Sequence, residues 1–484
     1  MVMQWAADEM ATADLNDKRL DKRLIQILSD MSERPNMSIP AASGGHAEMT
    51  AAYRFYDNDK ATWEAIIEPH VVESKKRIAA EKTVLLVQDT TEIDLTRPEQ
   101  QVLGAGPLDG GPRRGTFVHL LEGFTPEGVP LGAAWAQSQA RDEESLDIPQ
   151  AEKREIRKNA PIEEKESFRW LEGLRQARSV AEECPNVKCL YVADSEADIY
   201  ELFAEPRGQL DWLIRLSQDR ATISDKESET ADVGRLIRDQ LANAKVLFTK
   251  QISVRGRKAK VTCESRARRQ PREDREAFVE VRAITLTLRP PARPGQEQLP
   301  EVTINLVQVL EPNPPEGDTA IEWILLTTLP IDTVEQVQQV IQYYTTRWMI
   351  ELFFRTLKSG CRIEERRFER LDRLETCLAV SLIVAWRLLY LCRMGREFPD
   401  MSCDTIFDPS EWKSVWMAVH HEPPPATAPP LGVMMRLIAE LGGYVNRKNA
   451  DPPGTQTLWL GLQRMHDLSM AWNIFGPGAS RKVV

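Results

Sequence analysis

Apolar residues recur at helical spacing near both ends of the chain. Five apolar side chains between Leu20 and Met31 share one face of a predicted helix, and the opposite face is basic. Residues 374–391 form a long apolar stretch, and residues 457–475 carry a second amphipathic pattern. Both ends of the chain are therefore predicted to be helical.

Short apolar runs, typical of strands, fill the region between them. Residues 83–89 and 187–194 are apolar runs that each end in an aspartate. Residues 115–124 and 129–136 predict a hairpin, and residues 162–183 predict a helix. Three strands, a helix and a fourth strand, with Asp on the first and fourth strands, is the opening order of a ribonuclease-H-like fold.

Residues 207–322 contain further short β-rich runs separated by Pro- and Gly-rich segments. We interpret them as a β subdomain inserted into the α/β core. Residues 323–328 then return as the last core strand, followed by a helix with Asp332 as its expected N-cap. The chain is thus predicted to be a multi-domain α/β protein with helical domains at residues 1–70 and 401–484 and a ribonuclease-H-like core at residues 71–400.

Composition agrees with a globular protein of two to four domains, since 42% of the 484 residues are apolar and 28% are charged. The sequence predicts neither a signal peptide nor a membrane-spanning segment. Seven scattered cysteines without a Cys-x2-Cys pair favour a reducing cytoplasm over a zinc site.

The net charge of −11 argues against a nucleic-acid partner. Basic residues nevertheless concentrate at 250–282 and 362–373, so a basic groove remains compatible with the composition.

The segment Tyr344–Lys358 has no Pro or Gly and predicts one continuous helix. At 100° per residue, one face of that helix carries Tyr344, Arg347, Glu351, Arg355 and Lys358. The opposite face is apolar. A carboxylate among cations has two interpretations, a solvated ladder of ion pairs or a metal ligand flanked by groups that hold phosphates.

Asp89 and Asp194, at the ends of predicted strands, supply partners for Glu351. Either Asp alone is more often a turn former. Together the three carboxylates make a hard-oxygen set suited to Mg²⁺. Two such ions could clamp the attacking and leaving oxygens of an in-line phosphodiester displacement.

Several motifs resemble the cut-and-paste bacterial DDE transposases of the insertion-sequence four family. The spacing Tyr-x2-Arg-x3-Glu-x6-Lys within Tyr344–Lys358 is the strongest of them. The others are Asp89-Thr-Thr, Gly115-x-x-Val-His119, Lys165-Glu-x-x-x-Trp-Leu171, Asp194-x-Glu-Ala-Asp-Ile199 and Leu441-Gly-Gly-Tyr444. Residues 1–70 are similar to the family's DNA-end-binding domain.

The resemblance implies a role for each position. Asp89, Asp194 and Glu351 would be the catalytic metal ligands. Tyr344, Arg347 and Lys358 would hold a phosphate beside the cleaved end, with Arg355 as a further DNA contact. Trp323 would stack on a flipped base, with a core Trp as the alternative, and Arg215 would brace that nucleotide, with a surface strand Arg as the alternative. Phe354 departs from the family pattern, in which a polar residue contacts DNA.

The implied function is a DNA transposase that acts on transposon inverted-repeat ends and on target DNA. It would cut the ends through a hairpin intermediate and join them to target DNA with two Mg²⁺ ions, for which Mn²⁺ may substitute. Residues 401–484 would pair two protomers into a homodimer in the synaptic complex, in the bacterial cytoplasm at the nucleoid. Two alternatives are a nuclease of the same fold that joins no strands and a non-catalytic transposition inhibitor.

Overall fold

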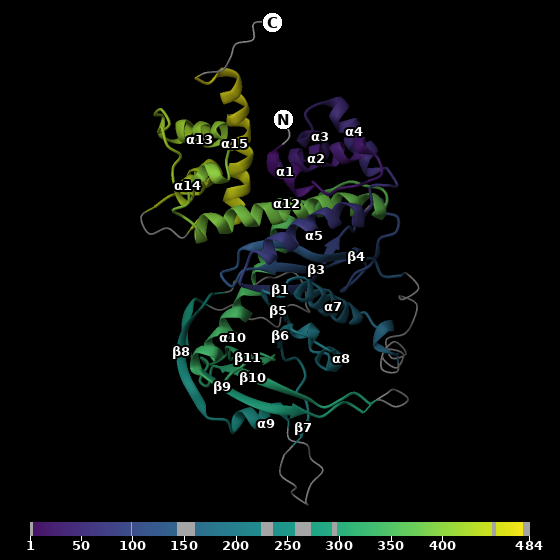
Figure 1. Cartoon of the computed structure of the whole chain (residues 1–484), viewed down its shortest axis with the longest axis vertical. Helices are drawn as coiled ribbons and strands as arrows, with labels where there is room; N and C mark the ends of the chain where they lie inside the picture. Colours follow the sequence, from purple (N-terminus) through teal and green to yellow (C-terminus); the bar gives the residue numbers. More distant parts are fainter. Residues whose placement is uncertain are drawn as a thin grey trace, which may run out of the picture. The chain divides into compact units, whose positions relative to one another are not determined.

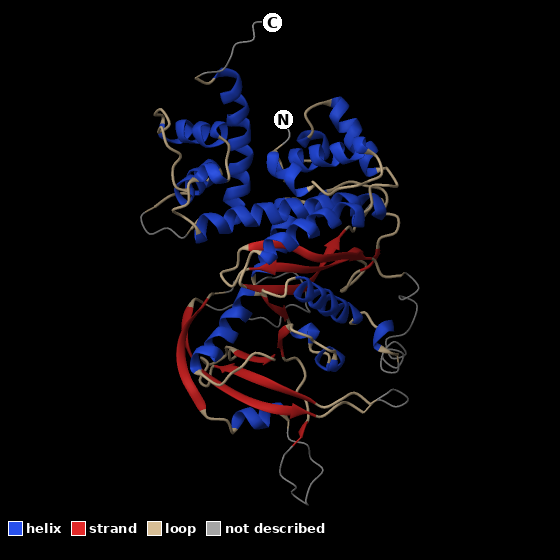
Figure 2. Ribbon diagram, viewed as in Figure 1, coloured by secondary structure: helices blue, strands red, loops and turns tan. Residues whose placement is uncertain are grey.

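The computed structural model describes residues 3–97, 99–142, 160–223, 236–256, 273–292, 298–447 and 452–477. The chain forms two compact units (Figures 1 and 2). Unit 1 contains Met1–Val84, Asp89–Pro149 and Trp348–Val484, and unit 2 contains Leu85–Gln88 and Gln150–Arg347. Strand β1 (Thr83–Asp94) therefore contributes residues to both. These units cut across the three predicted domains, whose boundaries stay a prediction.

Unit 1 begins with a group of helices, as the N-terminal pattern predicts. They are α1 (Gln4–Glu9), α2 (Lys18–Glu33), α3 (Ile39–Ala42), α4 (His46–Tyr56) and α5 (Trp63–Ala79). The predicted apolar face of α2 is largely buried, from Leu24 to Met31. The Asp17 side chain caps α2 by accepting a hydrogen bond from the Arg19 N–H at 2.9 Å. Helix α5 runs through residue 70, so the predicted end of the first domain falls inside a helix.

The sheet of unit 1 is built around the predicted hairpin. Strands β3 (Arg114–Phe124) and β4 (Pro130–Gln139) pair antiparallel, β2 (Gly106–Pro107) pairs with β3, and β1 lies on the other side of β3. Gly128 has a φ of 87° in the hairpin turn, a conformation that favours glycine. The strand β1 continues to Asp94, so the prediction that it ends at Asp89 is wrong.

A long central helix, α12 (Leu371–Glu397), supports unit 1. It packs against α2, α5, β4, α14 and α15. By length and composition this helix could cross a membrane, although no membrane-spanning segment was predicted from the sequence. In the structure, 78% of its most apolar window is buried inside the protein. Such burial is that of a core helix, because a membrane span would present this surface to lipid.

The C-terminal part of unit 1 is helical, as predicted. It contains η7 (Cys403–Thr405), α13 (Pro409–His420), α14 (Leu431–Leu441) and α15 (Thr455–Phe475), of which the sequence analysis missed α13. A Cβ on Gly442 would lie 1.8 Å from the Thr457 oxygen, and one on Gly461 would lie 1.8 Å from the Ile438 oxygen. The Gly-Gly motif after Leu441 therefore allows α14 and α15 to approach closely.

Unit 2 is organised around a mixed sheet. Residues Leu85–Gln88 of β1 are followed in the sheet by β5 (Lys188–Ala193), β6 (Asp211–Arg215), β11 (Glu322–Thr327), β10 (Val302–Leu310), β9 (Arg275–Leu288) and β7 (Thr222–Ile223), and β8 (Val246–Val254) also pairs with β9. Its helices are η2 (Ile162–Glu164), α7 (Phe168–Glu183), η3 (Ser195–Ala197), α8 (Tyr200–Ala204), α9 (Ile237–Ala242) and α10 (Val334–Thr346). The predicted helix at 162–183 is thus two helices.

The predicted β insertion is not a separate sheet. Strand β6, which falls within residues 207–322, is parallel to β5 and belongs to the core. Strands β9 and β10 form as predicted, and β10 pairs antiparallel with β11. They extend the core sheet because the outer edge of β11 offers backbone groups that a further strand satisfies. The α10 cap is Thr333, in a capping box with Gln336, rather than the expected Asp332.

Candidate active site

Asp89 lies in β1 beyond a fully buried run of five residues, and its side chain is half-buried. Its Oδ1 accepts a hydrogen bond from the Thr90 N–H at 2.7 Å. The Thr90 hydroxyl contacts Nδ1 of the buried His119 on β3 at 2.9 Å. His119 belongs to the motif that begins at Gly115, so this motif braces the strand that carries Asp89.

The residue before Asp89 is held by a separate network in unit 2. The Gln88 amide donates to the Arg169 carbonyl oxygen at 2.8 Å and accepts from the Tyr191 hydroxyl at 2.6 Å. A Cβ on Gly173 would lie 2.0 Å from the Gln88 side chain, so helix α7 needs glycine there. The sequence analysis missed Gln88, because its partners are 81 and 103 residues away along the chain.

Asp194 directly follows β5, as predicted. It is half-buried and caps the short helix η3, since its Oδ1 accepts from the Glu196 N–H at 2.8 Å. Arg169 donates to the Glu196 carboxylate at 2.9 Å. The turn that presents Asp194 is therefore tied to α7.

The segment that carries Glu351 is not the single helix predicted. Helix α10 ends at Thr346, and α11 (Met349–Arg355) is followed by a π-helical turn, η5 (Thr356–Gly360). The Thr345 and Thr346 hydroxyls both donate to the Gln342 carbonyl oxygen, at 2.6 and 3.3 Å. Such side-chain bonds compete with the backbone ladder and favour a break at the helix end.

The two faces of this segment differ from the prediction in part. Ile350, Phe353 and Leu357 are buried, as expected for the apolar face. Glu351 is half-buried in the first turn of α11. Tyr344 and Arg347, predicted for the open face, are 5% and 7% exposed. These two side chains therefore do not belong to a solvated face.

Unit 2 brings together four of the predicted DNA contacts. The rings of Trp323 and Tyr344 lie edge to face with centroids 5.6 Å apart, and the Arg347 guanidinium lies 5.8 Å from the centre of the Tyr344 ring. Burial raises the pKa of the Tyr344 phenol, and the nearby charges of Arg347 and Arg215 act in the opposite direction. Asp194 also contributes to this pKa, so it belongs to the same cluster.

Glu322, the residue before Trp323 on β11, is held by hydrogen bonds from three side chains. The Glu322 carboxylate accepts from Arg238 at 2.5 Å and from the Gln308 amide at 3.4 Å. Arg215 donates to the Glu322 carbonyl oxygen at 3.4 Å. Arg238 and Gln308 come from the segment predicted as an insertion, and the sequence offered no signal for this role.

In unit 1, the two remaining predicted cations have different surroundings. Arg355 is exposed in the last turn of α11. The Lys358 ammonium lies 3.9 Å from the Glu364 carboxylate. Burial lowers the pKa of Lys358, while Glu364 and Glu92 act to raise it. Lys358 is therefore paired within unit 1, whereas Arg355 is exposed to solvent.

The three predicted metal ligands belong to different units, with Asp89 and Glu351 in unit 1 and Asp194 in unit 2. Within the described part of the chain, no three Asp, Glu, His or Cys side chains are grouped closely enough to hold a metal ion. The donors themselves fit a divalent cation, because each is a half-buried carboxylate on a strand, turn or helix with a defined backbone. Their assembly into one site stays a prediction.

The predicted basic clusters are partly structural. Arg275 forms a bidentate pair with Glu311, at 2.5 and 2.9 Å. The buried Arg366 donates to backbone oxygens of Pro35 and Cys361. Arg373 pairs with Asp57 at 3.0 Å. Residues 257–272, which carry most of the first cluster, lie outside the described residues.

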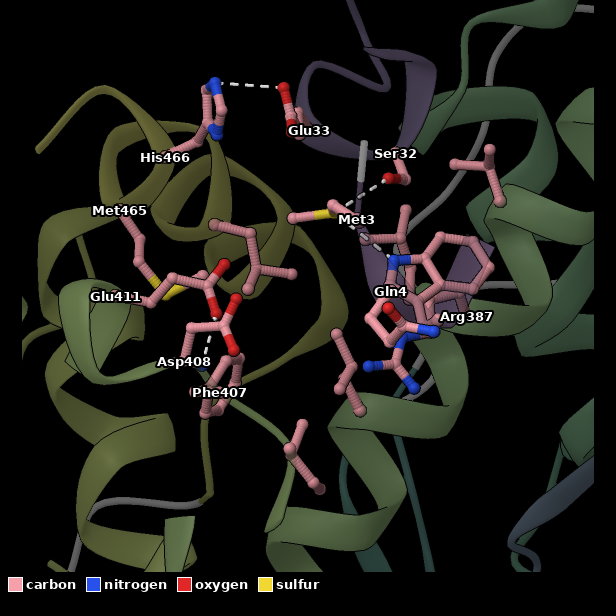
Figure 3. Close-up of a pocket in the computed structure, with 16 residues that line it drawn as sticks. Met3, Gln4, Ser32, Glu33, Arg387, Phe407, Asp408, Glu411, Met465 and His466 are labelled. Atoms are coloured by element: carbon pink, nitrogen blue, oxygen red, sulfur yellow. Dashed lines mark hydrogen bonds and ion pairs between the residues drawn. The ribbon is translucent and has the colours of Figure 1, made fainter. Parts of the chain in front are cut away.

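A pocket in unit 1 is lined by none of the predicted site residues (Figure 3). Its walls come from α1, α2, α12, α13 and α15. The His466 ring nitrogen lies 2.9 Å from the Glu33 carboxylate, and Arg34 donates to Asp467 at 3.1 Å. Burial raises the pKa of Glu411 to about 7. The pocket therefore marks where ion pairs join the N-terminal and C-terminal helices of unit 1.

Three family models match the chain. The transposase DNA-binding model matches residues 2–61, the transposase DDE domain matches residues 170–387, and the transposase Tn5 dimerisation domain matches residues 383–471. Along the chain they follow the order DNA-binding, DDE and dimerisation.

Among solved structures, the chain is similar to a piggyBac transposase in its synaptic complex with hairpin DNA. The two sequences are 10% identical, the match covers 82% of this chain and 72% of that chain, and the TM-score is 0.34. At this TM-score the likeness carries no weight. The family of the chain follows from the three family models. The chain belongs to the Tn5-like DDE transposases, which are metal-dependent enzymes that cleave DNA and transfer strands.

Proposed function

We propose that this transposase cuts transposon inverted-repeat ends through a DNA hairpin and joins the freed 3′ ends to target DNA with Mg²⁺. The observation that carries the proposal is the cluster in unit 2, where Trp323 and Tyr344 pack edge to face beside Arg347, Arg215 and Asp194. A simple nuclease needs carboxylates but no aromatic platform beside them.

The cluster suits a hairpin step for a physical reason. Closing a cut end into a hairpin bends the backbone sharply, and moving one base out of the stack relieves that strain. Half-buried Trp323 presents an aromatic surface for such a base, and stacking of this kind contributes about 1–3 kcal/mol per base. Arg215 and Arg347 would neutralise the adjacent phosphates.

Asp89, Asp194 and Glu351 would hold two Mg²⁺ ions, with Mn²⁺ as a substitute. Bound there, the metal would stabilise charge on the attacking and leaving oxygens of an in-line displacement. The residues around the carboxylates would orient them, through the Thr90–His119 contact for Asp89 and the η3 turn for Asp194. Water would be the first nucleophile, and the freed 3′-hydroxyl would attack the opposite strand.

The remaining parts of the proposal concern assembly. Residues 1–70 would bind the transposon end, and the C-terminal helices would pair two protomers in the synaptic complex, so that cutting waits for pairing. The protein would act in the cytoplasm at the nucleoid, because its substrate is chromosomal DNA.

The test is incubation of the purified protein with Mg²⁺ and a panel of duplexes that carry candidate inverted-repeat ends. Hairpin-ended products followed by strand-transfer products on a target plasmid are expected. Nicked products alone, with neither hairpins nor joined strands, would instead favour a nuclease. End binding without any cleavage would favour an inhibitor.

A further inference from the structure

Asp198 is a fully buried carboxylate four residues after Asp194. It is the second Asp of the motif Asp194-x-Glu-Ala-Asp198, and the proposed function leaves it without a role. Its partner Arg220 is 12% exposed. A buried charge is costly unless its oxygens are fully paired, so the contacts of Asp198 indicate what it holds.

Both carboxylate oxygens of Asp198 are used. Oδ2 accepts from the backbone N–H groups of Ser217 and Gln218, each at 2.7 Å. Oδ1 accepts from Nε and Nη2 of Arg220, at 2.9 and 2.6 Å. The same Nη2 donates to the Asp198 carbonyl oxygen at 2.6 Å. One side chain therefore joins the turn after β5 to the segment after β6.

These two segments carry two residues of the candidate site. Strands β5 and β6 are parallel, with Ala193 opposite Ile214. The next residues are Asp194, which follows β5, and Arg215, which is the last residue of β6. They therefore lie at the same end of two neighbouring strands, which are about 4.8 Å apart. Both contribute to the electrostatic surroundings of Tyr344.

The hydrogen bonding between β6 and its neighbouring strand ends just after Arg215. The Leu216 N–H still donates to the Ile324 oxygen, but the next two N–H groups donate to Asp198. Asp198 thus takes over from the sheet and sets the path of the chain immediately after Arg215. Its own place is set by η3, which Asp194 caps.

We propose that Asp198 is a positioning residue that holds the metal ligand Asp194 and the DNA-bracing Arg215 in one fixed geometry. Its carboxylate is fully buried with both oxygens occupied, so it acts through the two segments that it joins. This inference rests on the proposed function, since it assigns Asp198 to the same site.

The test is Asp198→Asn in the full-length protein. Asn has nearly the same shape and can still accept from the two backbone N–H groups, but it leaves the Arg220 charge without its counter-ion. We expect the Mn²⁺ concentration needed for half-occupancy to rise about 10-fold, as is typical when a residue supporting a metal ligand is removed. Electron paramagnetic resonance of unbound Mn²⁺ measures this, on the protein alone and on its complex with a duplex that the wild type cuts.

A second readout follows from the link to Arg215. The ratio of hairpin to nicked product should fall in Asp198→Asn at saturating Mn²⁺, because a displaced Arg215 braces the flipped nucleotide less well. A role in general stability would lower the amount of active protein without changing this ratio or the Mn²⁺ affinity.

The matched control is Glu205→Gln. Glu205 is a half-buried carboxylate in unit 2 that is also paired with an arginine, Arg175, at 2.8 Å, and it follows α8 rather than a site strand. It should keep the wild-type Mn²⁺ affinity and product ratio. If Asp198→Asn fails to fold, Arg220→Lys keeps the charge but loses the two-pronged contact, and the same shifts are expected in weaker form.

The possible outcomes separate the two proposals. Wild-type Mn²⁺ affinity and product ratio in a folded Asp198→Asn protein, or equal shifts in Glu205→Gln, would overturn the positioning role. If the wild type cuts no duplex, the proposed function fails, and Mn²⁺ binding by the protein alone still tests whether Asp198 supports Asp194.

Discussion

The two halves of the segment Tyr344–Lys358 lie in different surroundings although they share one predicted helix face. Tyr344 and Arg347 belong to unit 2 and are buried, with the Tyr344 ring against Trp323 and the Arg347 guanidinium near the Tyr344 ring. Glu351, Arg355 and Lys358 belong to unit 1 and are half-buried or exposed. The first half is a packed platform, and the second half is an accessible set of charges. Substitutions in the two halves should therefore fail in different ways.

The largest effect is expected for Glu351→Gln, in the accessible half. If Glu351 is a metal ligand as proposed, its loss removes several kcal/mol of transition-state stabilisation, or about 1,000-fold in cleavage rate. Binding to end DNA and the melting temperature should change little, because Gln has nearly the same shape as Glu and the side chain is only half-buried. Single-turnover cleavage and gel-shift assays measure both. Loss of DNA binding in a folded variant would mean that Glu351 has a structural role.

Trp323→Ala tests the packed half. We expect hairpin formation to slow about 5- to 160-fold, equivalent to the loss of one stacked base, while first-strand nicking changes little. Resolving nicked and hairpin products over time on a denaturing gel separates the two steps. The control is Trp348→Ala, because Trp348 is an exposed tryptophan. A fully buried tryptophan such as Trp170, which is 1% exposed, would not serve as a control. Equal slowing of both steps would remove the stacking role.

Arg347→Ala and Arg355→Ala compare the halves directly. If each holds one phosphate as proposed, each substitution should weaken DNA binding and reduce the salt dependence of log K by about one. Only Arg347→Ala should also lower the melting temperature, by about 2 °C, because its guanidinium packs near the Tyr344 ring. Calorimetry and salt titrations check this pair. A similar melting temperature for both variants would remove the distinction between packed and accessible halves.

The smallest effect is a pH dependence at Lys358. Burial lowers its pKa, so Lys358 loses its charge at a lower pH than an ordinary lysine. DNA affinity should fall a few-fold as pH rises toward 10, and Lys358→Arg, which stays protonated, should flatten this dependence. In the same window the unfolded chain binds more protons at Lys358 than the folded chain, so stability rises with pH. DNA affinity is measured against pH for the wild type and for Lys358→Arg. If affinity depends on pH with the same slope in both proteins, Lys358 does not contribute to this dependence.

Elements with strong local patterns were predictable. The alternation in β9 and β10, the hairpin β3–β4 and the apolar stripe of α2 follow from side-chain periodicity, and each formed nearly as predicted. Helix α13 was missed although it is one residue longer than the predicted α14, because it begins at a proline and a Pro-rich segment follows it. The break after α10 was missed because hydroxyls of Thr345 and Thr346 bond to a backbone oxygen, which periodicity does not report.

The residues of the candidate site also differ in whether the sequence could identify them. Sequence motifs pointed to Asp89, Asp194, Glu351 and their accompanying cations, because residue type and spacing are local properties of the chain. The supporting residues Gln88, Glu322 and Asp198 depend on hydrogen bonds to distant segments, and their types alone carried no signal.

By itself, the sequence of this protein determined the transposase motifs, the helical ends and most strands, since each depends on neighbouring residues. Only the tertiary structure decided that Tyr344 packs between Trp323 and Arg347, that β6 is a core strand, and that Asp198 joins the segments after β5 and β6. The physical reason is that burial and hydrogen bonding depend on which segments meet in space, and a helical wheel records only the direction in which a side chain leaves the backbone.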